Sequence, residues 1–165
     1  MGKLIIKMIK AHYNTDCDIE KLLKYIAGEG KNAGMEILLK ARGKGVSHRA
    51  SKAARQMIAV QKAAEKTAGR RMYHMVISFP PKVRDKAMVQ KAADTAADIL
   101  FENYQVFYGI HLSKENWHIH FAINAVSYRT GNKWHQNSRE FRDMKEKFIK
   151  CPAAKSCCCN PSPVL

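Results

Sequence analysis

We expect an α+β domain in which helices pack on one face of an antiparallel β-sheet, and three observations lead to this prediction. Stretches typical of strands and helices follow one another as strand, helix, basic helix, strand, helix, strand, strand and helix. Residues 117–126 alternate with a period of two, as a half-buried strand does. The connection at 112–116 is short and polar, which favours a hairpin between the strands that flank it.

The first strand is expected at residues 3–10, which are apolar and rich in isoleucine. A helix should follow, because Thr15 and Asp18 have the spacing of a capping box and Gly28 is a typical helix terminator. Its apolar residues recur at helical spacing: Ile19, Leu22, Leu23 and Ile26. Tyr25 lies in the last turn, off the centre of this stripe, where a tyrosine is usually a packed ring with a solvated hydroxyl.

The rest of the chain completes one domain and a tail. The other expected elements are strands at 71–79 and 104–111 and helices at 51–66, 82–102 and 138–150. After Lys150 the sequence CPAAKSCCCNPSPVL has three prolines, three adjacent cysteines and no periodicity. We therefore predict a domain at 1–150 and a disordered tail at 151–165.

The charge of the chain favours a polyanionic partner. Lys and Arg number 29 against 14 acidic residues, a net charge of +15, which indicates nucleic acid first and an acidic membrane surface second. The glycine-bearing segment 31–55 is especially basic and could be either a solvated charge run or an arm that contacts phosphates. The expected DNA-binding residues in it are Lys31, Arg42, Lys44, Arg49, Lys52 and Arg55.

The sequence predicts a cytoplasmic protein. No apolar run approaches the ~20 residues that a membrane-spanning helix needs. The opening MGKLIIKMIK has too short an apolar stretch and too many lysines for a signal peptide. Five cysteines without zinc-type spacing indicate no disulfide framework.

Three of the seven histidines lie in or beside the predicted hairpin. His118 and His120 are two residues apart and so point from one face of their strand, about 6.6 Å apart at Cα. The hairpin should bring His111 back beside His118. A lone histidine is usually an ordinary surface or hydrogen-bonded residue. Three imidazoles converging on one face favour a metal site, because imidazole suits borderline divalent cations.

The histidines and two other segments together resemble a known family. His111 with His118-x-His120-x-x-x-Asn124 resembles the three-histidine motif of plasmid relaxases, which belong to the HUH endonuclease superfamily. The segment LLKYIAGEGK around Tyr25 resembles the one that carries their nucleophilic tyrosine. The segment YHMVISFPP resembles the strand before the central helix of the MobP mobilisation group. The segments occur in the family's order and span most of the chain.

The resemblance implies a site- and strand-specific DNA nickase that starts the transfer of a plasmid or integrative element. Tyr25 would be the nucleophile and would form a 5′-phosphotyrosyl bond to the cut strand. His111, His118 and His120 would hold a divalent cation, most often Mg²⁺ or Mn²⁺ in this family, whose shell DNA and water oxygens complete. The implied partners are single-stranded DNA at a transfer origin and an accessory DNA-binding mobilisation protein.

Two further residues are expected to support the site. Many relatives carry an acid two residues after the first histidine, where this chain has Ser113, and Glu115 in the hairpin is the candidate to replace it. Asn124 falls on the same strand face as His118 and His120 and is expected to bond a metal ligand or DNA. Relatives also usually continue beyond the start of the cysteine-rich tail, so we expect a chain that is shortened at its C-terminus.

Other functions stay open from the sequence. Ser113 and the shortened C-terminus favour a non-catalytic DNA-binding remnant of a relaxase. A three-histidine zinc hydrolase with a water nucleophile would need neither Tyr25 nor DNA, but would leave the charge of +15 unexplained. A rolling-circle replication initiator is disfavoured, because such proteins usually place the tyrosine after the histidines.

Overall fold

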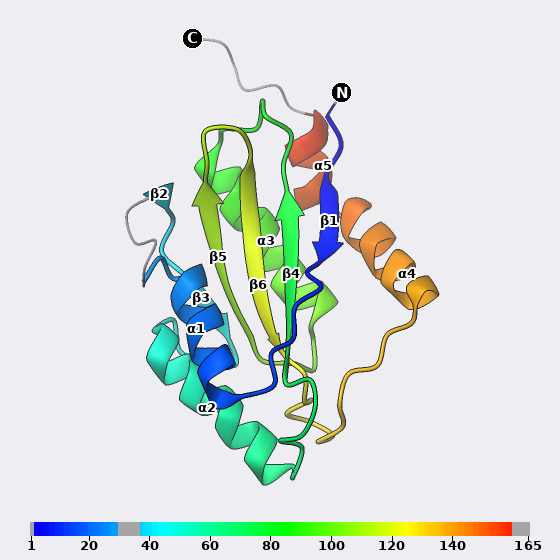
Figure 1. The fold of residues 1–165 in the computed structure, drawn as a ribbon. Coiled ribbons are helices and arrows are strands. Elements are labelled where there is room, and N and C mark those ends of the chain that lie inside the picture. Colours follow the sequence, from blue (N-terminus) through cyan, green and yellow to red (C-terminus); the bar gives the residue numbers. More distant parts are fainter. Residues whose placement is uncertain (1, 30–36, 160–165) are drawn as a thin grey trace.

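The computed structural model describes residues 2–29 and 37–159, and Figure 1 traces the course of the chain. The strands in these ranges are β1 (Ile5–Met8), β2 (Ile37–Leu38), β3 (Arg42–Lys44), β4 (Met72–Ser78), β5 (Val106–Leu112) and β6 (Trp117–Asn124). The helices are α1 (Asp16–Ile26), α2 (Ala50–Ala63), α3 (Lys86–Leu100), α4 (Ser138–Ile149) and α5 (Pro152–Cys159). None of them is long and apolar enough to cross a membrane.

The described strands form one antiparallel sheet in the order β1-β4-β6-β5-β2, and β3 also pairs with β5. The predicted hairpin is present as β5 and β6, in which His111 lies directly opposite His118. Strand β6 is central, and its His120 lies between Gly109 of β5 and Val76 of β4. The predicted α+β class and antiparallel sheet are therefore confirmed.

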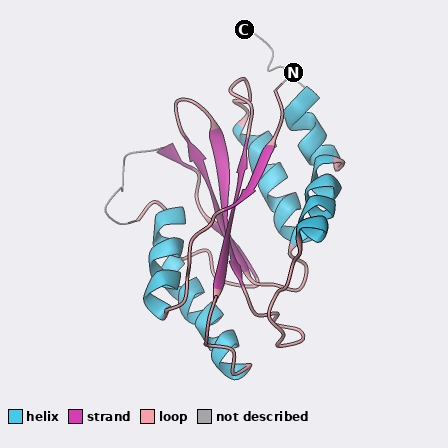
Figure 2. Ribbon diagram, turned by 45° about the vertical axis from the view of Figure 1, so that its right-hand side comes forward, coloured by secondary structure: helices cyan, strands magenta, loops and turns pink. Residues whose placement is uncertain are grey.

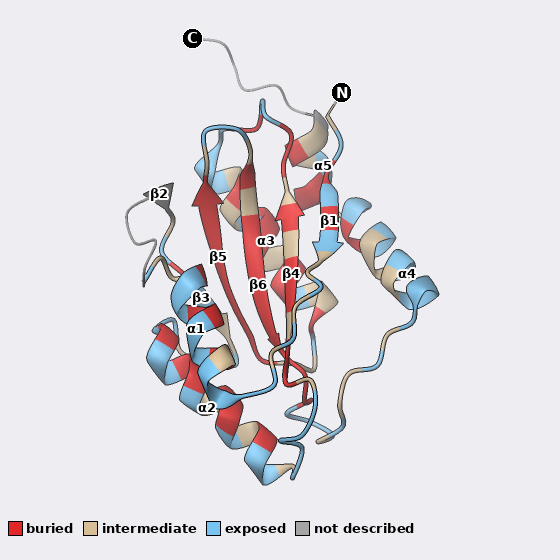
Figure 3. Cartoon of the chain, in the orientation of Figure 1, coloured by how far each residue is buried: buried red, intermediate tan, exposed pale blue. Residues whose placement is uncertain are grey.

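Helices pack on both faces of the sheet, and our expectation of a single covered face is wrong in this respect. On one face, the larger core includes Ile77, Phe121 and Phe148 and lies under α3, α4 and α5. On the other face, α1 and α2 cover a smaller core that includes Phe107 and Ala122, and Figure 2 shows the two helical layers on opposite sides. Every residue of β5 is buried, as Figure 3 shows, which is typical of a strand covered on both sides.

Two segments differ locally from the prediction. Residues 37–38 and 42–44, in the basic segment for which we expect no strand, form β2 and β3 on the edge of β5. Residues 152–159 form helix α5, where we predict a disordered tail. This helix is ordered by packing, because Ala154 and Cys157 are fully buried in the larger core. The last residues of the predicted tail, 160–165, lie outside the described ranges.

Helix α1 begins and ends where the sequence predicts. The Thr15 hydroxyl accepts a hydrogen bond from the Asp18 amide, and the Asp18 carboxylate accepts one from the Thr15 amide, which completes the capping box. Gly28 follows the helix with a φ of 76°, a conformation that favours glycine. The predicted apolar stripe of α1 is buried. This orientation leaves Tyr25 on the side of the helix that is not packed into the smaller core.

Candidate active site

The three predicted histidines lie together on the sheet face that also carries α1 and α2. One ring nitrogen from each of His111, His118 and His120 lies within 4.8 Å of the others. His111 and His120 are buried, and His118 is half-buried. Strand period and hairpin closure therefore bring the three rings together, as the sequence predicts.

Tyr25 lies over this cluster. Its ring centroid is 5.3 Å from the ring centroids of both His111 and His120. The tyrosine is 41% exposed, so its ring contacts the histidines and is also accessible to solvent. The structure thus brings the residue expected as nucleophile next to the residues expected to bind metal, although 86 positions separate Tyr25 from His111 in the sequence.

A glycine in β5 allows α1 to approach the sheet here. A Cβ atom on Gly109 would lie 2.7 Å from the carbonyl oxygen of Ile26 and 3.2 Å from its side chain. The absent side chain lets the last turn of α1 rest on β5, and the Ile26 carbonyl lies 3.3 Å from Nε2 of His111. Gly109 therefore sets the height of Tyr25 above the sheet.

Backbone acceptors define the tautomer of two of the rings. His111 donates through Nε2 to the Ile26 carbonyl, and His118 donates through Nδ1 to the Asn116 carbonyl at 3.0 Å. A neutral imidazole with one nitrogen protonated offers a lone pair on the other nitrogen. The acceptor nitrogens are therefore Nδ1 of His111 and Nε2 of His118, and a metal ion binds imidazole through such a nitrogen.

Two residues that the sequence analysis did not assign to the site lie behind His120. Nε2 of His74 in β4 is 2.8 Å from Nδ1 of His120, and Nδ1 of His74 is 3.1 Å from the Tyr13 hydroxyl. Burial, followed by the nearby His111, lowers the pKa of His74 to about 4. Burial and the neighbouring histidines likewise lower the pKa of His120 to about 2. Both rings are thus neutral at neutral pH.

The donor set fits a divalent cation. Metal–imidazole bonds are about 2.0–2.1 Å long, so nitrogens that share one ion lie about 3–4 Å apart. The three ring nitrogens lie within 4.8 Å of one another, so a small inward movement of the rings would bring them to this spacing. Nε2 of His120 is buried and has no hydrogen-bond partner among the described residues. Because buried polar atoms normally have a partner, this nitrogen fits a metal ligand. The three rings would hold the ion and leave coordination positions open for oxygen ligands.

Neither Ser113, which occupies the position of the relatives' acid, nor Glu115, the candidate to replace that acid, forms a hydrogen bond to the rings of His118 or His120 within the described part of the chain. The Ser113 hydroxyl bonds the backbone of Asn116 inside the hairpin. Glu115 is exposed, and its backbone carbonyl accepts a hydrogen bond from Arg84. Ser113 therefore stabilises the turn of the hairpin. The hydrogen bond at Glu115 involves its backbone carbonyl and does not support the histidines.

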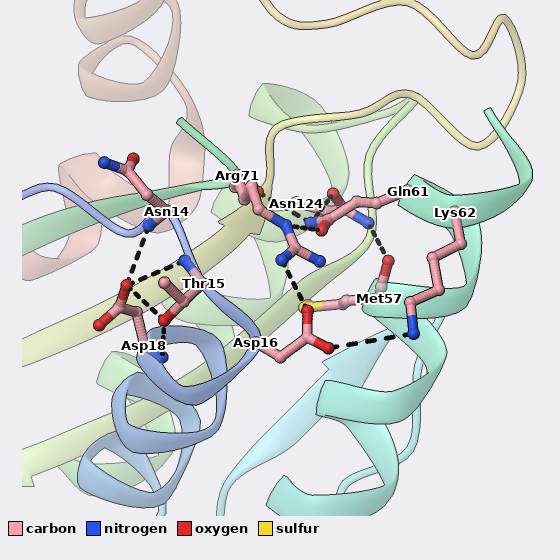
Figure 4. Close-up of polar contacts among 9 residues, drawn as sticks. All are labelled: Asn14, Thr15, Asp16, Asp18, Met57, Gln61, Lys62, Arg71 and Asn124. Atoms are coloured by element: carbon pink, nitrogen blue, oxygen red, sulfur yellow. Dashed lines mark hydrogen bonds and ion pairs between the residues drawn. The ribbon is translucent and has the colours of Figure 1, made fainter. Parts of the chain in front are cut away.

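Asn124 belongs to a buried hydrogen-bond network, and within the described residues its side-chain hydrogen bonds go to groups other than the three histidines. It is fully buried, and its amide bonds Gln61, Gln105 and the Met57 carbonyl. Figure 4 shows how this network continues through Gln61 to Arg71, whose guanidinium pairs with Asp16 at 2.6 Å. The network joins β6, α2, the residue just before β4 and the start of α1. It holds in place the helix that carries Tyr25.

The basic residues expected to bind DNA fall into three groups. Arg42 pairs with Asp94 at 2.6 Å, and Lys44 donates to the carbonyls of Ala97 and Phe101 at the end of α3, so both are engaged within the fold. Three others are exposed and lie at the start of α2 or just before it: Arg49, Lys52 and Arg55. Lys31 lies outside the described residues.

An antiparallel sheet that carries three clustered imidazoles beside a tyrosine is the arrangement of HUH-type nucleases. The chain belongs to the relaxase family, because the family model described as "Relaxase: MobA/VirD2-like, nuclease domain" matches residues 25–150. The protein is accordingly a DNA relaxase, an endonuclease with a nickase-type function in mobilisation, and its family implies a single-stranded DNA substrate.

A solved structure supports the fold independently. It is described as "Molecular Basis of Vancomycin Resistance Transfer in Staphylococcus aureus" and superposes with a TM-score of 0.58 at 11% identity. The match covers 92% of this chain and 89% of the other. No match was found among curated proteins.

Proposed function

We propose that the protein is a metal-dependent nickase, specific for one site and one strand, that joins Tyr25 to the 5′ phosphate of the DNA it cuts. The observation that carries this proposal is the position of the Tyr25 ring, 5.3 Å from the rings of His111 and His120. The substrate would be single-stranded DNA at the transfer origin of a plasmid or integrative element. An accessory mobilisation protein would present that DNA.

The chemistry is a phosphoryl transfer that conserves one phosphodiester bond. The Tyr25 oxygen loses its proton to solvent and forms a bond to phosphorus, while the bond from phosphorus to the 3′ oxygen of the preceding nucleotide breaks. The 3′ oxygen takes up a proton and leaves as a hydroxyl. Because one phosphate ester replaces another, the step can be reversed and the strand rejoined. Bound Mg²⁺ or Mn²⁺ would supply Lewis-acid stabilisation of the phosphate charge.

The first test is the nucleophile. Tyr25→Phe removes only the hydroxyl, so we expect unchanged folding and metal affinity, no nicking of supercoiled cognate plasmid, and no covalent adduct in mass spectrometry. The matched control is Tyr128→Phe, since Tyr128 is similarly exposed but bonds the Glu102 carbonyl. Full cleavage by Tyr25→Phe without an adduct would mean that water attacks, and the hydrolase alternative would then replace this proposal.

The second test is the metal site. His118→Ala and His120→Ala each remove one ligand, and loss of a ligand should weaken Mn²⁺ binding at least about tenfold in calorimetry. His135→Ala is the control, because His135 is an exposed histidine outside the cluster. Unchanged Mn²⁺ affinity in both cluster variants would contradict the assignment of the three ligands.

A further inference from the structure

His120 differs from the other two histidines in how its ring can be oriented. His118 lies at the start of β6 and reaches a hairpin carbonyl, and His111 reaches a carbonyl at the end of α1. His120 lies inside the central strand, where the backbone groups on both sides are used in the ladders with β4 and β5. Its orientation must therefore come from a side chain.

One side chain supplies that contact, and a second side chain bonds the first. His74 of β4 meets Nδ1 of His120 at 2.8 Å, and both residues are only 6% exposed. Tyr13, in the segment before α1, meets the far nitrogen of His74 at 3.1 Å. The three side chains thus form a continuous line of hydrogen bonds from the partly exposed Tyr13 hydroxyl to the middle of the histidine cluster.

The direction of these hydrogen bonds follows from proton counting. Each neutral imidazole has one donor and one acceptor nitrogen. If His74 donated to His120, the His120 proton would sit on Nε2, where a buried N–H with no acceptor among the described residues is destabilising. If His120 donates instead, its Nε2 carries a lone pair, His74 accepts through Nε2 and donates through Nδ1, and the Tyr13 oxygen accepts.

We propose that His74, held by Tyr13, is the positioning residue that orients His120 and keeps its Nε2 available to the metal. It would take the role that relatives give to an acid near position 113, because Ser113 is engaged in the hairpin turn and Glu115 is exposed. This inference rests on the proposed metal-dependent function. It concerns the metal affinity of the cluster and involves no direct contact between His74 and the substrate.

Two substitutions of His74 show whether its hydrogen-bond acceptor or only the volume of its ring matters for metal binding. His74→Phe keeps a ring but removes the acceptor, and should weaken Mn²⁺ binding about 10–100-fold, the usual cost of losing such an outer partner. His74→Gln places an amide oxygen within similar reach and should stay within about threefold of the unmodified protein, because it can still accept from Nδ1 of His120. His135→Phe and His135→Gln are the matched controls at an exposed histidine.

Two further measurements distinguish positioning from a general structural effect. Raising the Mn²⁺ concentration should restore nicking by His74→Phe, whereas a misfolded site would not recover. Long-range ¹H–¹⁵N spectra of the Mg²⁺-loaded protein should show His120 protonated on Nδ1.

Either of two results would overturn the inference. One is equal Mn²⁺ affinity for His74→Phe, His74→Gln and the unmodified protein, and the other is protonation of His120 on Nε2. Failure of the proposed function is separable, because it would appear as unchanged Mn²⁺ affinity in His118→Ala, which leaves His74 intact.

Discussion

At the scale of single residues, the buried histidines couple folding to pH. Burial lowers the pKa of His74 to about 4 from an ordinary value of 6.5, so the folded protein binds fewer protons there than the unfolded chain. This contribution to stability is fully present above pH 6.5 and is lost as the pH falls from 6.5 towards 4. At about 1.4 kcal/mol per pH unit, its upper limit is about 3 kcal/mol.

We therefore expect His74→Gln to flatten the pH dependence of stability. In metal-free protein, urea unfolding at pH 7.5 and pH 5 should show a smaller difference in free energy for the variant than for the unmodified protein, because glutamine does not titrate. His48→Gln, at an exposed histidine, should retain the full difference. An unaltered pH dependence in His74→Gln would show that His74 titrates alike in folded and unfolded chains.

Gly109 carries a second prediction at this scale. In Gly109→Ala the new Cβ would meet the Ile26 carbonyl at 2.7 Å, so the end of α1 must move away from β5. We expect a loss of about 1–3 kcal/mol in stability and a strong reduction in nicking, because both Tyr25 and the acceptor of His111 are displaced. Gly131→Ala is a control of the opposite kind, since its φ of 70° should lower stability while nicking is kept. Equal nicking in the two variants would contradict this account of Gly109.

At the scale of elements, patterns local in sequence were predictable and partners distant in sequence were not. Thr15 and Asp18 identify the start of α1, and the alternation around His118 identifies β6, because each pattern depends on neighbouring residues. That β4 lies beside β6, and so brings His74 to His120, depends on strand order, which no local pattern encodes. His74 could have been placed on one face of its strand, but not beside the cluster.

In the basic segment, too, the partners of individual residues could not be predicted from the sequence, and this segment gives a further prediction. Composition marks it as cationic, but only the tertiary structure shows that Arg42 and Lys44 are engaged within the fold. Replacing Arg49, Lys52 and Arg55 together by Ala should flatten the log–log salt dependence of binding to single-stranded DNA by about 2, at ~0.7 per lost phosphate contact. Arg42→Ala with Lys44→Ala should instead lower the melting temperature and leave that slope nearly unchanged. A flattened slope in the second variant alone would reverse this assignment.

At the scale of the whole molecule, the larger apolar core and the histidine cluster lie on opposite faces of the sheet. The face under α3, α4 and α5 holds the larger apolar core. The opposite face combines the smaller core under α1 and α2 with the histidine cluster and Tyr25. The sequence could reveal the cluster, because its three histidines share one hairpin. It could not reveal the second helical layer, because three of the six buried residues of α2 are alanines and one is a glutamine, which together give a weak apolar pattern.

This separation predicts that stability and activity respond differently to loss of α5. Ending the chain after Lys150 removes Ala153, Ala154 and Cys157 from the larger core and exposes the surface of α3 beneath them. Burial of these side chains is worth about 2–3 kcal/mol, so the melting temperature should fall by about 5–10 °C. Lys155→Ala, on the exposed side of α5, should change it little. Below the lowered transition, Mn²⁺ affinity and covalent attachment to DNA should persist, because the cluster lies on the other face. Loss of both activities in a shortened chain that is still folded would instead make α5 part of the active unit.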